Sequence, residues 1–564
     1  MTRSSPLHRL SIMRSIVLIA ALSGSLLHAQ QVSIEDFSRV VLPPRLEKSI
    51  VYDTGAEQRR IQNPSIVEGE DGALIAAWSN KGARGDNDPS SFIQASTSDD
   101  GGRTWTRPVT AAPASSINAT FMRTVSGDVL LFYNRNRSDM QDDTEIVFRR
   151  SSDNGRTWSD ATYVDTGFPV NILVHNGILL SNGEWLLPFH YDRSGQGEPF
   201  SVSRTDFVSA IAISADEGKS WRRYGAIEIP NEVRWPNITN WAVEPAVAEV
   251  EPGKLLMIIR SRAGRLYEAR SSDFGRTWSK AAPTNFSSPD SKISLERLSS
   301  GSLLLGWNNS GLLRYRYPLL LSLSQDYGGS WPFTVTLDDD NLQLDYPASW
   351  QAKSGIYVVY GHDLKRVLLS KLDVASLRSP WTAINDQRSW EVRDGALRRS
   401  AASSFPSAQS WLAWSKVVNF TARREIRSVE VDVRFDEAVG ANTVGLFAPY
   451  QDESNWTALV WSKGAAAAGI QEESHMGFLP PQGYSSHTSR SSFSRAEARP
   501  GVWYRMSLSR NSRNVTWRIA ALDTGTEVAS GAAEARWRGA FVALGSREGA
   551  CSFDNLKVVS GTAQ

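Results

Sequence analysis

An eight-residue pattern that recurs five times constrains the fold of this 564-residue chain more than any other feature. Each copy reads Ser-x-Asp-x-Gly-x-(Thr/Ser)-Trp. Internal repeats of this kind indicate a series of similar structural units packed side by side. The copies are SDDGGRTW at 98–105, SSDNGRTW at 151–158, SADEGKSW at 214–221, SSDFGRTW at 271–278 and SQDYGGSW at 324–331.

The residue types of this box suit a β-turn. The Asp carboxylate can accept hydrogen bonds from turn amides, Gly allows a positive φ, the hydroxyl closes the loop and Trp packs beneath it. Each carboxylate is thereby used within its own turn. We therefore expect the boxes to be structural, and neither five calcium loops nor five catalytic aspartates.

A Gly-containing turn that leads into an apolar strand precedes each box. A sixth such unit, SGIYVVYG at 354–361, has no box after it, so six strand units with five boxes predict six blades of a β-propeller. We expect a strand that lies somewhere between Val32 and Val51 to complete the last blade. The other five units are DGALIAAW at 71–78, SGDVLLFY at 126–133, NGEWLLPF at 182–189, PGKLLMII at 252–259 and SGSLLLGW at 300–307.

The tandem boxes after Gly-Leu-Leu strands resemble the sialidase (neuraminidase) superfamily, in its bacterial exo-α-sialidase-like branch with BNR repeats, over roughly residues 40 to 375. The resemblance implies a six-bladed propeller at residues 30–378 and an exo-glycoside hydrolase that acts on glycans. Boxes of this kind also occur in propellers without catalytic activity, so the fold does not by itself fix the function.

The pattern changes near Trp390, where alternation of apolar and polar residues replaces the boxes. It predicts an antiparallel β-sandwich of jelly-roll type at residues 388–561. The opening WEVRDGAL and the closing FDNLKV resemble concanavalin/LamG-like domains that accompany carbohydrate-active enzymes. Trp411 and Trp456 have two interpretations, stacking on sugar rings or packing in the core, and burial statistics favour the core.

The N-terminus has the features of an export signal. A basic stretch with Arg3, Arg9 and Arg14 adjoins an apolar or small run at 15–27, and Leu27-His28-Ala29 fits a cleavage site. The run is shorter than the roughly 20 residues that span a bilayer, which favours cleavage over membrane anchoring. We expect a signal peptide at 1–29, no integral membrane segment after its removal, and a secreted or periplasmic protein.

Charge and cysteine content exclude other classes. Lys and Arg number 61 against 60 Asp and Glu, so no net field draws the chain to nucleic acid. Cys551 is the single cysteine, which rules out an intrachain disulfide and a Cys-rich metal site. No motif calls for a metal or an organic cofactor, and the oligomeric state is left open.

The sialidase resemblance implies a particular set of reacting groups. The substrate of such enzymes carries a carboxylate on its anomeric carbon, and this charge repels a carboxylate nucleophile. In these enzymes a Tyr activated by a Glu therefore attacks the anomeric carbon, while an Asp acts as acid and base. Tyr346 in LDYPASW falls at the family's nucleophile position, and Glu244 in WAVEPAV at that of its base. The alternatives are a Tyr packed between blades and a Glu on the surface. Asp86 and Asp88, in NKGARGDNDPSSF, both qualify as the acid/base.

Arginines would bind the substrate carboxylate in bidentate fashion. Arg260 and Arg316 match two of the family's positions, and Arg314 is an alternative to Arg316. The third position departs from the family, because Gln62 stands in the register of the arginine of an Arg-Ile-Pro motif. Nearby arginines that could replace it are Arg59, Arg60 and Arg84.

The missing arginine widens the range of sugars to uronic acids, deoxysugars or 2-keto acid relatives of sialic acid. It also leaves two further hypotheses open. One is a carbohydrate-binding propeller without catalytic activity. The other is a propeller glycosidase or lyase that uses His175 or His190, which flank the third Gly-strand unit, although a single His is more often structural.

Overall fold

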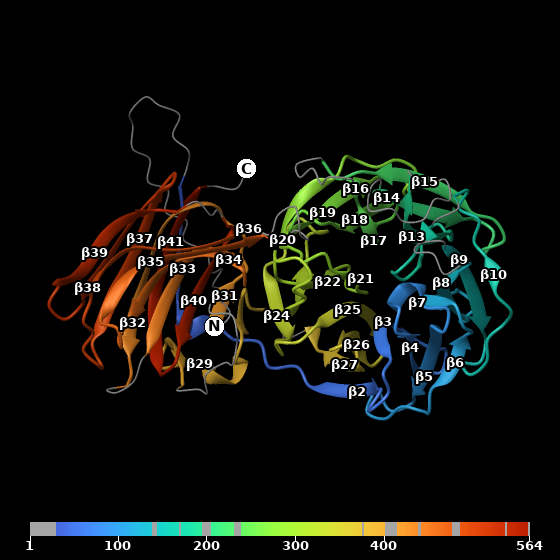
Figure 1. Ribbon diagram of the computed structural model, residues 1–564, viewed down its shortest axis with the longest axis horizontal. Coiled ribbons are helices and arrows are strands. Elements are labelled where there is room, and N and C mark those ends of the chain that lie inside the picture. Colours follow the sequence, from blue (N-terminus) through green and yellow to red (C-terminus); the bar gives the residue numbers. More distant parts are fainter. Residues whose placement is uncertain are drawn as a thin grey trace, which may run out of the picture.

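The computed structural model describes residues 30–137, 144–168, 171–193, 205–230, 238–374, 377–400, 414–437, 442–476, 485–535 and 539–561. The predicted signal peptide and Trp411 lie outside these residues. Two all-β domains lie side by side, a six-bladed propeller and a two-sheet sandwich (Figure 1). The prediction of an all-β chain with this architecture is confirmed.

The blades are antiparallel sheets, except that β16 pairs in parallel with β14 in the third blade. The innermost strands β3, β7, β17, β21 and β25 surround the centre of the ring (Figure 1). The first blade comprises β3 (Arg60–Glu68), β4 (Leu74–Lys81), β5 (Phe92–Ser98) and β6 (Val109–Ala112). The second comprises β7 (Ser116–Arg123), β8 (Val129–Asn136), β9 (Thr144–Ser151) and β10 (Thr162–Tyr163). The third comprises β11 (Asn171–Ile172), β12 (Ile178–Leu179), β13 (Trp185–Asp192), β14 (Thr205–Ser214), β15 (Arg222–Ile227) and β16 (Ile238–Trp241).

The remaining three blades are built in the same way. The fourth comprises β17 (Val243–Glu251), β18 (Lys254–Arg260), β19 (Arg265–Ser271) and β20 (Ala282–Ser287). The fifth comprises β21 (Ser294–Arg297), β22 (Leu303–Asn308), β23 (Leu319–Ser324) and β24 (Phe333–Asp338). The sixth comprises β25 (Leu344–Ala352), β26 (Gly355–His362), β27 (Arg366–Leu372) and β2 (Lys48–Asp53).

The box turns have the predicted structural role. In the first box the Asp100 carboxylate accepts hydrogen bonds from the hydroxyls of Ser98 and Thr104 and from the Thr104 amide, at 2.7 to 2.9 Å. These bonds hold the pKa of Asp100 below its usual range. Gly102 has a φ of 86°, and its carbonyl accepts a hydrogen bond from the Trp105 indole at 3.2 Å. The corresponding Asp in each of the other four boxes makes the same pair of bonds to its Thr or Ser.

The N-terminal residues are divided between the two domains. The strand that completes the sixth blade is β2 (Lys48–Asp53), at the C-terminal end of the range predicted for it, and it pairs with β27. The first strand, β1 (Gln30–Glu35), instead pairs with β41 (Cys551–Gly561) in the sandwich, although the sequence placed residues 30–378 in the propeller. The sixth blade needs only one edge strand, and β1 instead pairs with residues 556–561 of β41, next to residues 551–553 that pair with β30.

The sandwich packs an eight-stranded sheet against a seven-stranded one around an aromatic and aliphatic core. It begins with β28, ahead of the expected residue 388. The first sheet consists of β1, β29 (Trp390–Arg393), β30 (Ala396–Arg399), β41, β32 (Arg424–Phe435), β37 (Trp503–Asn511), β38 (Asn514–Ala521) and β39 (Glu527–Glu534). The second consists of β28 (Trp381–Ile384), β31 (Ser415–Asn419), β40 (Phe541–Arg547), β33 (Thr443–Asp452), β34 (Asn455–Ser462), β35 (Ala467–Met476) and β36 (Ser485–Arg495). Short 3-10 helices are η1 (Phe37–Arg39), η2 (Gly85–Asn87) and η4 (Gln387–Ser389).

The outer face of the seven-stranded sheet packs on the fourth and fifth blades. Trp456 is fully buried there in one hydrophobic cluster with Trp307 of the propeller, so it packs in the core rather than stacking on a sugar ring. Polar groups also cross the boundary, where Ser287 donates to Asp452 at 2.6 Å. The two domains therefore share one continuous buried interface.

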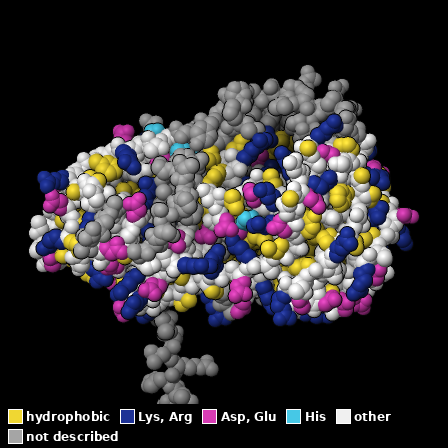
Figure 2. Space-filling model, turned by 60° about the horizontal axis from the view of Figure 1, so that its bottom comes forward, with side chains coloured by type: hydrophobic (Ala, Val, Ile, Leu, Met, Phe, Trp, Pro, Cys, Tyr) yellow, Lys and Arg dark blue, Asp and Glu magenta, His cyan; other side chains and the backbone are white. Residues whose placement is uncertain are grey.

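The surface of the molecule mixes charges of both signs. On the face shown in Figure 2, basic and acidic side chains alternate over both domains without an extended region of one sign. None of the helical segments that the structure describes has the length and apolar composition needed to cross a bilayer.

Candidate active site

A recurring bulge in the innermost strands builds the site. Strands β3, β7, β17 and β25 each shift register near their start, and the residue at the shift has a left-handed backbone with φ of 47° to 61°. The four residues are Asn63, Asn118, Glu244 and Tyr346. Bulges redirect side chains, and left-handed non-glycine residues cluster at functional sites. Three of the four precede Pro, a signal in the sequence that marks this position.

Arg260, at the end of β18, joins two of the predicted residues. Its Nη1 contacts the Glu244 carboxylate and lies 3.5 Å from the Tyr346 hydroxyl, while its Nε donates to Asp290 at 2.7 Å. Burial by itself lowers the pKa of Arg260, but the charges of Asp290 and Glu244 raise it well above its usual value. The structure therefore brings Tyr346, Glu244 and Arg260 together as the sequence predicted.

The Tyr346 ring lies 4.9 Å from the guanidinium of Arg316, which precedes the fifth box. Burial raises the pKa of the Tyr346 hydroxyl and the Glu244 charge adds to this effect, while the charges of Arg316 and Arg260 oppose it. The resting hydroxyl is consequently protonated. Arg316 also pairs with Asp345 at 3.1 Å. Arg314, the alternative, is exposed, and its main chain bonds to Pro289.

Gln62 lies in the same site, and a lysine that the sequence analysis missed lies beside it. The Gln62 amide donates to Asp345 at 3.2 Å and its carbonyl oxygen accepts from the Lys81 ammonium at 3.0 Å. Lys81 ends the fully buried strand β4, and its side chain is 2% exposed. A charged residue in a buried strand is uncommon unless it is paired, which is the signal that identifies Lys81.

The structure separates the two candidate acids. Asp88 accepts hydrogen bonds from the amide and hydroxyl of Ser90 and from the Arg84 amide, which lower its pKa to about 2 and fix the loop. Asp86 on η2 has a 58% exposed side chain that contacts Lys81. The charge of Lys81 lowers the pKa of Asp86, and Arg316 contributes from across the pocket. Asp86 therefore faces the site, and Asp88 supports its loop.

The arginines near the first blade do not replace the missing one. Arg59 bonds to the Asn80 side chain and to the Ser90 carbonyl, and its guanidinium lies over Phe92. Arg60 and Arg84 have exposed side chains. Lys81 is therefore the cation that occupies this side of the pocket.

Both candidate histidines contact the main chain of Glu244. The Glu244 amide donates to Nδ1 of His190 at 3.1 Å. Burial lowers the pKa of His175 well below its usual value, although a hydrogen bond to the Glu244 main chain acts in the opposite direction. Burial also lowers the pKa of His190 to about 3. Both rings are buried and neutral, and they hold the bulge at Glu244.

An aromatic and cationic pair borders the site between the third and fourth blades. The guanidinium of Arg262 stacks 3.3 Å from the Trp241 ring, and both side chains bond to Asp290 at 3.1 Å. Neither residue was predicted from the sequence. Among the described side chains of the site, four cations lie close to four carboxyl groups. They are Lys81, Arg260, Arg262 and Arg316 against Asp86, Glu244, Asp290 and Asp345.

Known proteins share this architecture. A family model described as a BNR repeat-like domain matches residues 72–359, just over half of the chain. A protein named sialidase from Bacteroides fragilis (strain YCH46) is 27% identical over 235 residues, 38% of this chain and 37% of that protein. The match to the solved Hadza microbial sialidase Hz136 covers 58% of this chain and 69% of the Hz136 chain, with 19% identity and a TM-score of 0.50. The match to the solved NanB sialidase from Streptococcus pneumoniae covers 58% of this chain and 71% of the NanB chain, with 13% identity and a TM-score of 0.48.

The matched residues run from the turn of the first Gly-strand unit to the sixth one, so they contain all five boxes. The similarity to Hz136 likewise shows the propeller fold. The chain therefore belongs to the BNR repeat-like domain family, as a sialidase-like member.

Proposed function

We propose that this protein is an exo-glycoside hydrolase that removes a terminal acidic sugar, sialic acid or a related one, from glycans with retention of configuration. The observation that carries the proposal is the bridge of Arg260 Nη1 between the Glu244 carboxylate and the Tyr346 hydroxyl. It places a half-buried tyrosine, a carboxylate base and a cation next to one another in one site.

Tyr346 is the nucleophile and Glu244 accepts its proton. A neutral phenol can approach an anomeric carbon that bears a carboxylate, whereas an anionic nucleophile would be repelled. As the Tyr346 oxygen bonds to the anomeric carbon, its proton passes to Glu244, and the nearby guanidinium groups of Arg260 and Arg316 stabilise the developing phenolate.

Asp86 is the acid and base on the opposite side of the pocket. It protonates the glycosidic oxygen as the bond to the leaving group breaks. In the second step it takes a proton from the water that displaces Tyr346, which recovers its proton from Glu244. Lys81 keeps Asp86 ionised in the free protein. A bound anionic sugar would offset that positive charge and raise the pKa of Asp86 toward the acid form.

The substrate carboxylate binds between Arg260, Arg316 and Lys81. Lys81 takes the side where Gln62 stands in place of the expected arginine. An ammonium binds as a point charge, and a guanidinium as a fork that matches both carboxylate oxygens. We infer that this site is less selective for the position of the carboxylate than one with three arginines, which admits uronic acids as well as sialic acids.

Sugar release from a panel of sialylated, uronate-capped and rhamnose-capped glycans, followed by mass spectrometry, tests the proposal. The wild type is expected to release an acidic sugar, and the Tyr346→Phe and Glu244→Gln variants to lose nearly all turnover with unchanged thermal stability. The matched control Tyr163→Phe alters an exposed strand of the second blade and should keep full activity. Binding of these glycans without release by the wild type would contradict hydrolysis and favour a carbohydrate-binding propeller.

We further propose that the protein is exported and that its N-terminal 29 residues are removed. The basic and apolar segments of that stretch support this. N-terminal sequencing of the mature protein should begin near Gln30, and an intact Met1 on protein recovered outside the cytoplasm would contradict cleavage.

A further inference from the structure

A cavity of about 290 Å³ lies in the central channel beyond the reacting residues. Its walls include residues 246–249 of β17, which follow Glu244, and 347–350 of β25, which follow Tyr346. Its lining also includes the exposed side chains of Arg297 and Leu179. The cavity therefore lies further along the inner strands than Tyr346 and extends toward the opposite face of the propeller.

Lys292 places a positive charge in this cavity. It is 2% exposed, and no hydrogen bond or ion pair of its ammonium is found among the described residues. Burial lowers the pKa of Lys292 to about 8, against the charges of Glu244 and Asp345, so it is mostly protonated at neutral pH. Those two carboxylates are themselves engaged by Arg260 and Arg316. A buried cation without a direct partner favours an anionic ligand.

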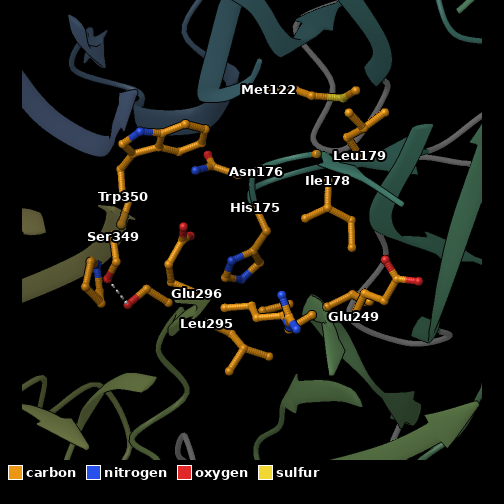
Figure 3. Close-up of a pocket in the computed structure, with 18 of the residues that line it drawn as sticks. Met122, His175, Asn176, Ile178, Leu179, Glu249, Leu295, Glu296, Ser349 and Trp350 are labelled. Carbon is orange, nitrogen blue, oxygen red and sulfur yellow. Dashed lines mark hydrogen bonds between the residues drawn. The ribbon is translucent and has the colours of Figure 1, made fainter. Parts of the chain in front are cut away.

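His175 and Glu296 supply further polar groups. Figure 3 shows the His175 imidazole directed into the cavity, with Glu296 and Trp350 on one side and Glu249 on the other. Nε2 of His175, a residue only 6% exposed, has no hydrogen-bond partner among the described residues. Burial raises the pKa of Glu296 to about 8, so its carboxyl is a neutral donor below that pH.

The carboxyl group of Glu249, at the other side of the cavity, already has hydrogen-bond partners. Glu249 accepts hydrogen bonds from the amide and hydroxyl of Ser181 and from the Gly253 amide, at 2.7 to 2.8 Å. The apolar part of the wall is formed by Trp350, Met122 and Ile178. An aromatic face beside a few polar donors is the usual wall of a sugar site.

We propose that this channel cavity is a second binding site, for a small organic anion of the size of an acidic monosaccharide, held by Lys292 and His175. The carboxylate of the ligand lies at the Lys292 ammonium, and the ring lies against Trp350. The proposal does not depend on the proposed hydrolase activity, because none of these three residues takes part in the chemistry assigned to Tyr346.

Glucuronate binding, measured by ligand-observed NMR, tests the site, with methyl glucoside as a neutral probe of similar size. The measurement uses the Arg316→Met variant, in which binding beside Tyr346 is weakened. That variant is expected to bind glucuronate at least about tenfold more tightly than methyl glucoside. Adding Lys292→Met should weaken glucuronate binding by about tenfold or more, whereas Lys292→Arg should retain it.

Lys254→Met in the same background is the matched control, because Lys254 is an exposed lysine of the same propeller that pairs with Glu251. Equal loss of binding in the Lys254 and Lys292 variants, or equal affinity for the two probes, would overturn the proposal. Crystals soaked in glucuronate give a measurement that needs no variant. The sugar carboxylate should lie within hydrogen-bond distance of Lys292, and water alone in the cavity would contradict it.

Discussion

The main-chain amide of Glu244 donates a hydrogen bond to Nδ1 of His190 at 3.1 Å. This bond requires His190 to be neutral with its proton on Nε2, and burial keeps it so by lowering its pKa to about 3. Because Glu244 has a left-handed φ of 47°, its side chain reaches Arg260 only while the bulge is held. His190 is therefore a positioning residue for the proposed base.

Replacing His190 with Leu should lower kcat more than it changes KM. The substitution leaves the buried Glu244 amide without an acceptor, which costs about 1–3 kcal/mol and corresponds to roughly 5- to 150-fold in kcat. His190→Gln, whose side-chain oxygen can accept the same bond, should recover most of the activity. A catalytic His190 would instead give an inactive Gln variant and remove one limb of the pH–rate profile.

The two loop aspartates should respond differently to the leaving group. Asp86→Asn removes the proposed acid, so the rate of hydrolysis of an alkyl glycoside should fall by about 100- to 10,000-fold. An aryl glycoside with a good leaving group needs no proton for bond cleavage, so its rate of hydrolysis should fall far less. Asp88→Asn removes loop hydrogen bonds and should affect both substrates equally. A leaving-group dependence in Asp88→Asn rather than in Asp86→Asn would reverse the assignment.

Lys81→Met should act on substrate binding. The loss of a charge-assisted contact costs about 1.5–3 kcal/mol, which predicts roughly a 10- to 100-fold rise in KM for an acidic substrate. Lys81→Arg keeps the charge and should restore binding. Steady-state kinetics on both variants separate the two parameters, and an unchanged KM in Lys81→Met would remove Lys81 from the substrate site.

Glu296 should make folding stability depend on pH. Its pKa of about 8 in the folded protein lies above the value of 4.5 in the unfolded chain, so its contribution to stability is complete below pH 4.5 and is lost as the pH rises to 8. The unfolding temperature of the wild type should therefore fall between pH 5 and pH 8 relative to that of Glu296→Gln. Parallel curves for the two proteins would show that Glu296 is not buried as an acid.

The repeats allowed the propeller to be predicted, because each box forms its turn from its own residues. Asp100 bonds to neighbours four residues away at most, so sequence spacing alone defines its role. The position of β1 could not be predicted in the same way. Its pairing with β41 joins residues more than 500 positions apart, and no local pattern specifies which distant strand it will pair with.

The proximity of Tyr346 and Arg260 could be expected from the sequence, because the resemblance supplied their positions relative to the repeats. Lys81 was missed because its role arises from the contacts with Gln62 and Asp86 rather than from a motif. Asp86 and Asp88 have the same chemistry in one loop, and what distinguishes them is the hydrogen bonding of Asp88 to its own loop and the contact of Asp86 with Lys81. Local spacing does not encode such three-dimensional contacts.

The most direct test of the central claim is intact-protein and peptide mass spectrometry after incubation with fluorinated acidic glycosyl fluorides. Fluorine beside the anomeric carbon slows the second step, so a covalent sugar should accumulate. The account predicts a mass increase of one sugar unit on the peptide that contains Tyr346 and none in Tyr346→Phe. Hydrolysis of these reagents by the wild type without an adduct, or an adduct on another residue, would contradict Tyr346 as the nucleophile.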